Sequence, residues 1–261
     1  MHRRQVLAGL AASVIASPDL PGQQQPANTF LELTTWHLHN SEENQPARLA
    51  DYLQTGLAPA LSRAGAKLAG AFSNVIGQDG PYYVTLTEYS SLKAYGDVLA
   101  ALRSDPAHDR ELEKLSAGPG VPFVRVESSL LRSFDRMPSV TYPDATGKRP
   151  PRIFELRTYE SQSFLTLRRK VGMFNTGEMQ IFQRLGMRPV FFGETIIGPK
   201  QPNLNYMLSY DDLAARDKLW HDFGSDPEWK KLSSEPQLKD AEIVANISNA
   251  ILRPLTFSAI R

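Results

Sequence analysis

Three side chains that could bind a ligand alternate along one short stretch of the sequence, IFELRTYE at 153–160. Residues two apart in a strand point to the same side, so Glu155, Arg157 and Tyr159 share one face. Phe154 and Leu156 form the opposite, apolar face. A carboxylate, a guanidinium and a phenol on one face can together orient a small molecule. The alternative is that Glu155 and Arg157 simply pair with charges on neighbouring strands.

A second candidate is the carboxylate of Glu178. It falls where a helical repeat calls for a hydrophobic residue, in a stripe formed by Val171, Phe174, Ile181 and Leu185. A carboxylate that faces a sheet needs a partner or has a raised pKa, and a raised pKa is one way to make a general base. The alternative is that drift at Gly177 turns Glu178 to the helix edge and into water.

Histidine is sparse in this sequence. His221, after Trp220 near the end of a predicted helix, is by type the best single acid/base residue or haem ligand, although it could instead cap that helix. His37 and His39 could share a metal ion, but zinc or iron needs a third ligand and the spacing indicates none. No Ser-His-Asp arrangement, nucleotide loop or paired metal motif occurs. The sequence therefore assigns no metal and no cofactor.

Composition excludes several classes of function. The 261 residues are 41% hydrophobic, which suffices for one large core or two small ones. The net charge is +1 with no basic stripe, so no nucleic acid partner is expected. The absence of cysteine excludes disulfides, thiolate metal sites and cysteine nucleophiles. After residue 16, no stretch approaches the roughly 20 apolar residues that a membrane span needs.

The first 28 residues have the pattern of an export signal followed by a disordered tail. Arg3 and Arg4 precede a short apolar run from Val6 to Ala16, and small residues and a polar Pro/Gln tract follow. This order is typical of a twin-arginine signal and predicts a periplasmic or secreted protein. The alternative is an amphiphilic disordered tail without a targeting role.

The triplet Ser-Asp-Pro occurs twice, at 104–106 and 225–227, which is a separation of 121 residues. An Asp-Pro pair begins a helix well, because the carboxylate caps free N–H groups and proline tolerates the first turn. At the same offset Leu131-Arg132 matches Leu252-Arg253, and at an offset of 123 LELTTW (31–36) matches FELRTY (154–159). These ordered matches predict a tandem duplication.

Each half has the order β-α-β-β-α-β, which is that of a ferredoxin-like unit. We therefore expect an α+β fold in which two tandem ferredoxin-like units form an intrachain α/β barrel, since an isolated unit would expose edge strands. The expected organisation is a signal and tail at 1–28, a first, degraded repeat at 29–134, a linker at 135–151 and a second repeat at 152–261. In such a barrel, the face of Glu155, Arg157 and Tyr159 should line the interior, with Trp36 in the equivalent place. Phe154 and Leu156 should then pack under the helices.

The second half resembles a NIPSNAP domain over about 100 residues. The similarity lies in IFELRTYE (153–160), GMRPVFFGETIIGP (186–199), NYMLSYDDLAARDKLW (205–220) and FGSDPEWKKL (223–232). The first half is a degraded copy, in which Glu228-Trp229 becomes Ala107-His108. The resemblance implies a dimeric α/β-barrel fold, shared with small monooxygenases and haem-handling proteins, and it supplies no established catalytic residues.

The sequence thus favours an exported protein that binds a small hydrophobic or aromatic molecule in its barrel. Glu155, Arg157, Tyr159 and Trp36 are the ligand-binding candidates, and Glu178 and His221 the catalytic candidates. Monooxygenase-like or proton-transfer chemistry is the class expected if the protein is an enzyme. The alternative is a non-enzymatic assembly or protein-binding module, and homo-oligomerisation is left open.

Overall fold

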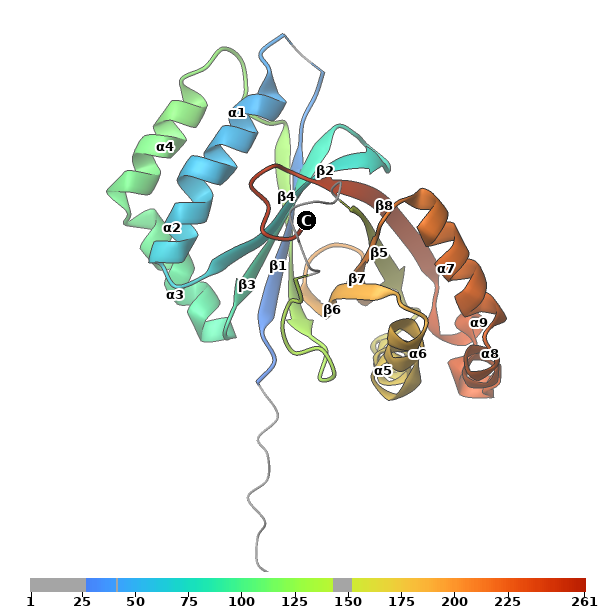
Figure 1. Cartoon of the computed structure of the whole chain (residues 1–261). Coiled ribbons are helices and arrows are strands. Elements are labelled where there is room, and N and C mark those ends of the chain that lie inside the picture. The colour runs from blue at the N-terminus through green and yellow to red at the C-terminus, as the bar shows by residue number, and fades with distance from the viewer. Residues whose placement is uncertain (1–26, 41, 143–151) are drawn as a thin grey trace, which may run out of the picture.

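The computed structural model describes residues 27–40, 42–142 and 152–261. Within these residues, eight strands close into one barrel in the order β1-β3-β2-β8-β5-β7-β6-β4, with antiparallel neighbours throughout (Figure 1). The strands are β1 (Phe30–His37), β2 (Lys67–Ile76), β3 (Tyr82–Tyr89), β4 (Arg125–Ser133), β5 (Ile153–Glu160), β6 (Arg188–Ile197), β7 (Asn203–Tyr210) and β8 (Asn246–Pro254).

Helices form two layers outside the barrel, one contributed by each half of the chain (Figure 1). The first layer contains α1 (Gln45–Asp51), a π-helical segment (Tyr52–Leu57), α2 (Ala58–Arg63), α3 (Leu92–Arg103) and α4 (Pro106–Ser116). The second contains α5 (Phe164–Met173), a π-helical segment (Phe174–Glu178), α6 (Met179–Arg184), α7 (Leu213–Ser225), α8 (Pro227–Ser234), a 3-10 turn (Pro236–Leu238) and α9 (Asp240–Ile243). None of the described helices combines the length and the apolarity that crossing a membrane requires.

The two halves pair their strands in the same register. In the first half Leu33 of β1 lies opposite Leu86 of β3, and in the second half Leu156 of β5 lies opposite Met207 of β7. These positions are separated by the same 123 and 121 residues as the sequence matches. The fold is α+β. Because the strand registers agree, a position in one half has a counterpart at a fixed offset in the other.

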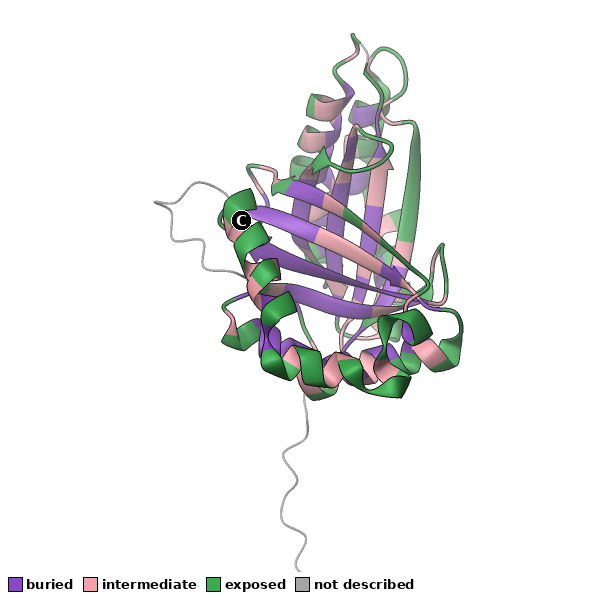
Figure 2. Ribbon diagram, turned by 90° about the vertical axis from the view of Figure 1, so that its right-hand side faces the viewer, coloured by how far each residue is buried: buried purple, intermediate pink, exposed green. Residues whose placement is uncertain are grey.

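The middle of the barrel interior is apolar, whereas Thr158, Thr195, Asn203 and Asn205 form a hydrogen-bonded polar network towards one end. One cluster of buried side chains draws on all eight strands and on no helix, and includes Leu31, Phe72, Phe154, Met207 and Leu252. Leu156 packs against this cluster. A barrel of eight strands is about wide enough for its own side chains to fill it, and here apolar side chains fill its middle. The strands are accordingly the most buried part of the molecule, and the helices expose their outer faces (Figure 2).

The predicted assignment of strand faces was wrong. Phe154 and Leu156 point into the barrel, whereas Ile153 and Tyr159 belong to a second cluster that includes Leu167, Phe182 and Phe223 of the helices. Glu155, Arg157 and Tyr159 therefore lie between the sheet and the second helical layer.

The helix starts predicted from the two Asp-Pro pairs are confirmed. The Asp105 carboxylate accepts from the backbone N–H of Ala107, and that of Asp226 accepts from those of Glu228 and Trp229. Gly65 and Gly186 follow the helices with φ values of 88° and 83°, in the left-handed region that favours glycine.

Two segments outside the strands and helices complete the structure. Within the expected linker, Met137 and Val140 are buried against the barrel and its helices. Near the C-terminus, Ile260 is fully buried in the interior cluster, and this end of the chain lies across the barrel in Figure 1. Residues 1–26 of the predicted signal and tail (1–28) and residues 143–151 of the linker lie outside the described residues.

Candidate functional site

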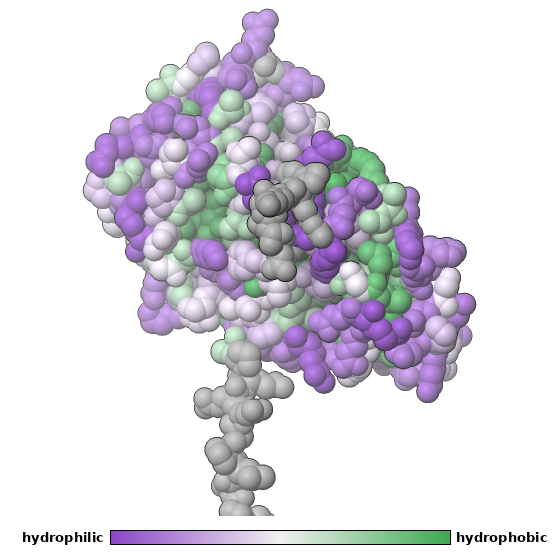
Figure 3. All heavy atoms as spheres, viewed as in Figure 1, coloured by the Kyte–Doolittle hydropathy of each residue, from purple (hydrophilic) through white to green (hydrophobic). Residues whose placement is uncertain are grey.

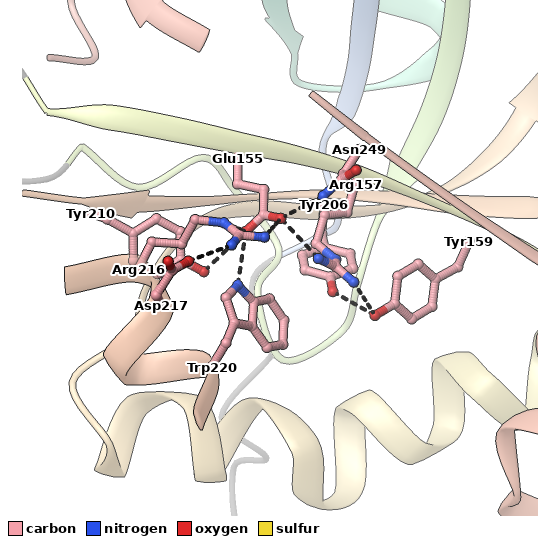
Figure 4. Close-up of polar contacts among 9 residues, drawn as sticks. All are labelled: Glu155, Arg157, Tyr159, Tyr206, Tyr210, Arg216, Asp217, Trp220 and Asn249. Atoms are coloured by element: carbon pink, nitrogen blue, oxygen red, sulfur yellow. Dashed lines mark hydrogen bonds and ion pairs between the residues drawn. The ribbon is translucent and has the colours of Figure 1, made fainter. Parts of the chain in front are cut away.

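Glu155 is the centre of a buried polar cluster between β5 and α7 (Figure 4). Its side chain is fully buried. Its carboxylate accepts hydrogen bonds from Arg216 Nη2 (2.6 Å) and Nε (3.0 Å), Arg157 Nη1 (2.8 Å), Trp220 Nε1 (2.8 Å), Asn249 Nδ2 (2.9 Å) and Tyr210 Oη (3.4 Å). Both carboxylate oxygens are thus saturated with donors.

These donors determine the charge of Glu155. Burial by itself would raise the pKa of this carboxyl, but the hydrogen bonds from Arg216 and the charge of Arg157 outweigh burial and lower the pKa to about 2. Glu155 is therefore ionised at neutral pH and is a weak base. Its role is to fix two guanidinium groups beside each other.

Arg157 is held on several sides by this cluster. Its Nη1 donates to Glu155, its Nη2 donates to Tyr159 Oη at 3.2 Å, and the guanidinium carbon lies 4.5 Å from the ring centre of Trp220. Tyr206 Oη also donates to Tyr159 Oη, at 3.0 Å. The Nε–H of Arg157 is buried and has no hydrogen-bond partner. Such a donor costs about 1–3 kcal/mol unless a further group satisfies it.

A buried ion pair adjoins Tyr159 on the other side. Lys170 Nζ of α5 lies 3.0 Å from Glu178 Oε2, and both side chains are almost completely buried. Burial raises the pKa of Glu178 and alone would lower that of Lys170, but the Glu178 carboxylate raises the pKa of Lys170 above its usual range. The ammonium group also lies 5.4 Å from the ring centre of Tyr159. The prediction that Glu178 faces the sheet with a partner is confirmed, and the alternative of a solvated Glu178 is wrong.

The other predicted site residues lie apart from this cluster. His221 of α7 is exposed. Trp36 lies on β1, four strands away from β5 around the barrel, where its indole donates to Thr85 and its ring packs edge-on against Tyr52 and Phe123. The structure thus brings together Glu155, Arg157, Tyr159 and Glu178, and it does not bring His221 or Trp36 to them.

Sequence reasoning missed several members of the cluster. Arg216 lies four residues before Trp220, on the inner stripe of α7, and Lys170 lies three residues after Leu167 on the inner stripe of α5. The same signal that identified Glu178, a charged residue at an apolar helical position, could have found both. Asn249 gave no such signal, because a lone polar residue on a strand is common.

The first half has an uncharged side chain at the positions that correspond to Lys170, Glu178 and Arg157. The counterparts of Lys170 and Glu178 are Leu49 and Leu57, and the counterpart of Arg157 is Thr34, by the offsets of the strand register. Thr34 makes a short hydrogen bond to Ser128, the counterpart of Asn249. The fold itself therefore does not require the charged cluster.

The first helical layer contains a small pocket of about 90 Å³. Arg48, Tyr52 and Lys114 are among its lining residues. Tyr52 Oη lies 2.9 Å from Nε2 of His108, and His108 is buried. Arg48 donates to two backbone carbonyls, so its charge is already engaged. No group of three or more metal-ligating side chains lies together in the part of the chain that the structure describes.

The Glu155 cluster can therefore stabilise negative charge, but it offers no free carboxylate as a base. Arg157 and Tyr159 present N–H and O–H donors, and Trp220 supplies an aromatic wall. Glu155 is saturated with donors, and Glu178 is paired in the interior.

Part of the second half is similar to a known protein family. Residues 154–259 match the family model described as NIPSNAP. A search of curated proteins found no match.

Solved structures share the whole fold at low sequence identity. A putative monooxygenase from Lactobacillus acidophilus is 10% identical, with a TM-score of 0.57 over 87% of this chain and 94% of the other. A putative monooxygenase from Fusobacterium nucleatum is also 10% identical, with a TM-score of 0.56 over 88% and 94% of the two chains. An anthrone oxidase-like protein is 9% identical, with a TM-score of 0.50 over 87% and 92%. At these identities the similarity extends to the fold alone.

Proposed function

We propose that the second half, whose residues 154–259 match the NIPSNAP family model, binds a small aromatic or hydrophobic molecule at the Glu155 cluster. The site lies between the sheet and α7, rather than inside the barrel as the sequence suggested. The observation that carries the proposal is the unsatisfied Nε–H of Arg157, a buried donor beside the face of Trp220.

The geometry favours binding, and it restricts any chemistry to steps in which negative charge develops on an oxygen of the ligand. Arg157 and Tyr159 would donate to that oxygen, and such preorganised donors are worth most where water is excluded. Proton transfer or cofactor-independent oxygenation of an aromatic compound belongs to this class. The putative monooxygenases of the same fold support the proposal by analogy only.

The first test uses 2-naphthol, an aromatic probe that is neutral at pH 7. Ligand-observed NMR should detect its binding to the wild-type protein. The substitution Arg157→Gln should weaken binding by about tenfold, because a hydrogen bond to a charged group contributes roughly 1.5–3 kcal/mol.

The matched control is Thr34→Val, which changes the counterpart of Arg157 in the first half and should leave binding unchanged. Binding that survives in Arg157→Gln but not in Thr34→Val would move the site to the first half. If 2-naphthol does not bind even to the wild-type protein, the proposal is refuted.

The two halves are proposed to be copies of one ferredoxin-like unit, of which only the second has the site. The equal strand registers and the repeated cap pairs, Arg63 with Asp105 and Arg184 with Asp226, support this. The competing function, a non-enzymatic assembly or protein-binding module, predicts a stable homo-oligomer and no probe binding. Light scattering on the sample used for NMR distinguishes the two.

Export by the twin-arginine route is proposed from Arg3 and Arg4 and the apolar run after them. Replacement of both arginines by lysine should abolish the appearance of the protein in the periplasm of a bacterial host while its cytoplasmic level persists. An unchanged periplasmic yield would contradict the proposal.

A further inference from the structure

The charges in the Glu155 cluster do not balance. Arg157 and Arg216 both face a single buried carboxylate, and their side chains are only 13% and 21% exposed. The nearby Lys170 and Glu178 cancel each other. The remaining acids, Asp217 beside Arg216 and Asp240 at 3.7 Å from Lys170, are 74% and 57% exposed and lie at the surface. One buried positive charge is thus neutralised only by exposed carboxylates. Burying such a charge costs free energy unless an anion comes close.

The donors that remain available point to the same requirement. Arg216 uses Nε and Nη2 for Glu155, and its Nη1 donates to the exposed Asp217 at 2.9 Å. An exposed ion pair contributes only about 0–1 kcal/mol, so an external carboxylate can take the place of Asp217. The Nε–H of Arg157 is a second donor of the same cluster that lacks a partner.

Apolar surface adjoins these donors. Trp220 of α7 stacks on Arg157, and Ile247, which pairs with Tyr159 in the sheet, is 42% exposed. Asn249, two residues further along β8, is also exposed. Figure 3 shows hydrophobic surface beside α7, between otherwise hydrophilic helix faces.

We propose that the ligand of this site is an organic anion, a carboxylate on an aromatic body, whose charge is held by Arg157 and Arg216 and whose ring lies against Trp220. The proposal rests on the proposed function and names its ligand class. In the first half, the counterparts of Arg157, Arg216 and Trp220 are Thr34, Tyr95 and Leu99, so that half has neither the charge nor the indole.

The test compares 2-naphthoate with 2-naphthamide, which has nearly the same shape and no charge. Isothermal titration calorimetry should give an affinity for 2-naphthoate at least about tenfold higher, as expected for a charge-assisted hydrogen bond. The substitution Arg216→Gln should reduce this preference to about onefold.

The substitution Asp217→Asn provides a gain of function at the surface, where folding is not at risk. It frees Nη1 of Arg216 and should raise the affinity for 2-naphthoate about two- to fivefold, the equivalent of one exposed ion pair. The matched control is Asp222→Asn on the same helix, whose partner Lys218 is outside the cluster. This control should leave the affinity unchanged.

If the two probes bind with equal affinity while Arg157→Gln still weakens 2-naphthol binding, the ligand need not be an anion. This result would overturn the present proposal and leave the proposed function standing. An equal effect of Asp217→Asn and Asp222→Asn on the affinity would also overturn the proposal. The gain would then come from the change in net charge and not from the contact with Arg216. Loss of all probe binding in the wild type would refute the proposed function itself.

Discussion

At the scale of single residues, Glu155 organises the site without acting as its base. Six donor atoms surround its carboxylate, and they come from β5, β7, β8 and α7. A buried carboxylate with this many donors stays ionised and fixes the geometry of its partners. The candidate general base of the site therefore has to be sought elsewhere or supplied by the ligand.

The lowered pKa of Glu155 predicts a specific dependence of stability on pH. The pKa falls from 4.5 to about 2 on folding, so the ionised form contributes roughly 3 kcal/mol that is present above pH 4.5 and lost as the pH falls towards 2. The free energy of unfolding of the wild type, minus that of Glu155→Gln, should therefore shrink by roughly 3 kcal/mol between pH 6 and pH 2.

Urea unfolding followed by circular dichroism at the two pH values measures this difference. Glu113→Gln, at an exposed position of α4, is the control and should show no comparable change. A difference for Glu155→Gln that stays constant with pH would contradict the assigned pKa.

At the scale of elements, the sequence predicted the strands and helices well but reversed the two faces of β5. Alternation showed which residues share a face, as with Glu155, Arg157 and Tyr159, but not which face closes the barrel. Polar residues suggested a ligand cavity inside the barrel. In the structure they are buried because α7 supplies Arg216 and Trp220 as partners, and only contacts between distant segments could reveal that.

Helical periodicity was more informative than strand alternation. Glu178 interrupts an apolar stripe, and the structure places it in the interior with Lys170. His221 was chosen for its residue type, and it lies exposed on α7, apart from the Glu155 cluster. The position within an element therefore predicted the buried polar cluster better than the type of residue.

The ion pair on α5 and its π-helical continuation gives a prediction at this scale. Replacing both residues with leucine, as Lys170→Leu with Glu178→Leu, copies the first half of the chain. Because buried pairs are often replaceable by apolar residues, the double variant should be as stable as the wild type or more stable by about 1–4 kcal/mol. Glu178→Leu alone should lose about 3–5 kcal/mol, since it leaves the buried ammonium group with only the more distant and exposed Asp240, at 3.7 Å.

Chemical denaturation of the three proteins measures these differences. A double variant that is destabilised as much as the single one would contradict the view that the pair is dispensable for folding. In that case the pair would be a structural requirement of the second half, despite Leu49 and Leu57 at the same places in the first.

At the scale of the whole molecule, one barrel contains two chemically different helical layers. The first half packs Leu49, Leu57 and Thr34 where the second has Lys170, Glu178 and Arg157. Both halves contribute strands to the same closed sheet, so the first half is needed to complete the barrel whether or not it binds anything. The first half thus completes the barrel, and its side chains can be compared position by position with those of the second half.

The most direct measurement is a crystal structure of the full chain soaked with 2-naphthoate. Our account predicts the carboxylate on Arg157 and Arg216, with the ring against Trp220 and outside the barrel. Density for the ligand in the barrel interior, or only beside Tyr52 and His108 in the first half, would contradict it.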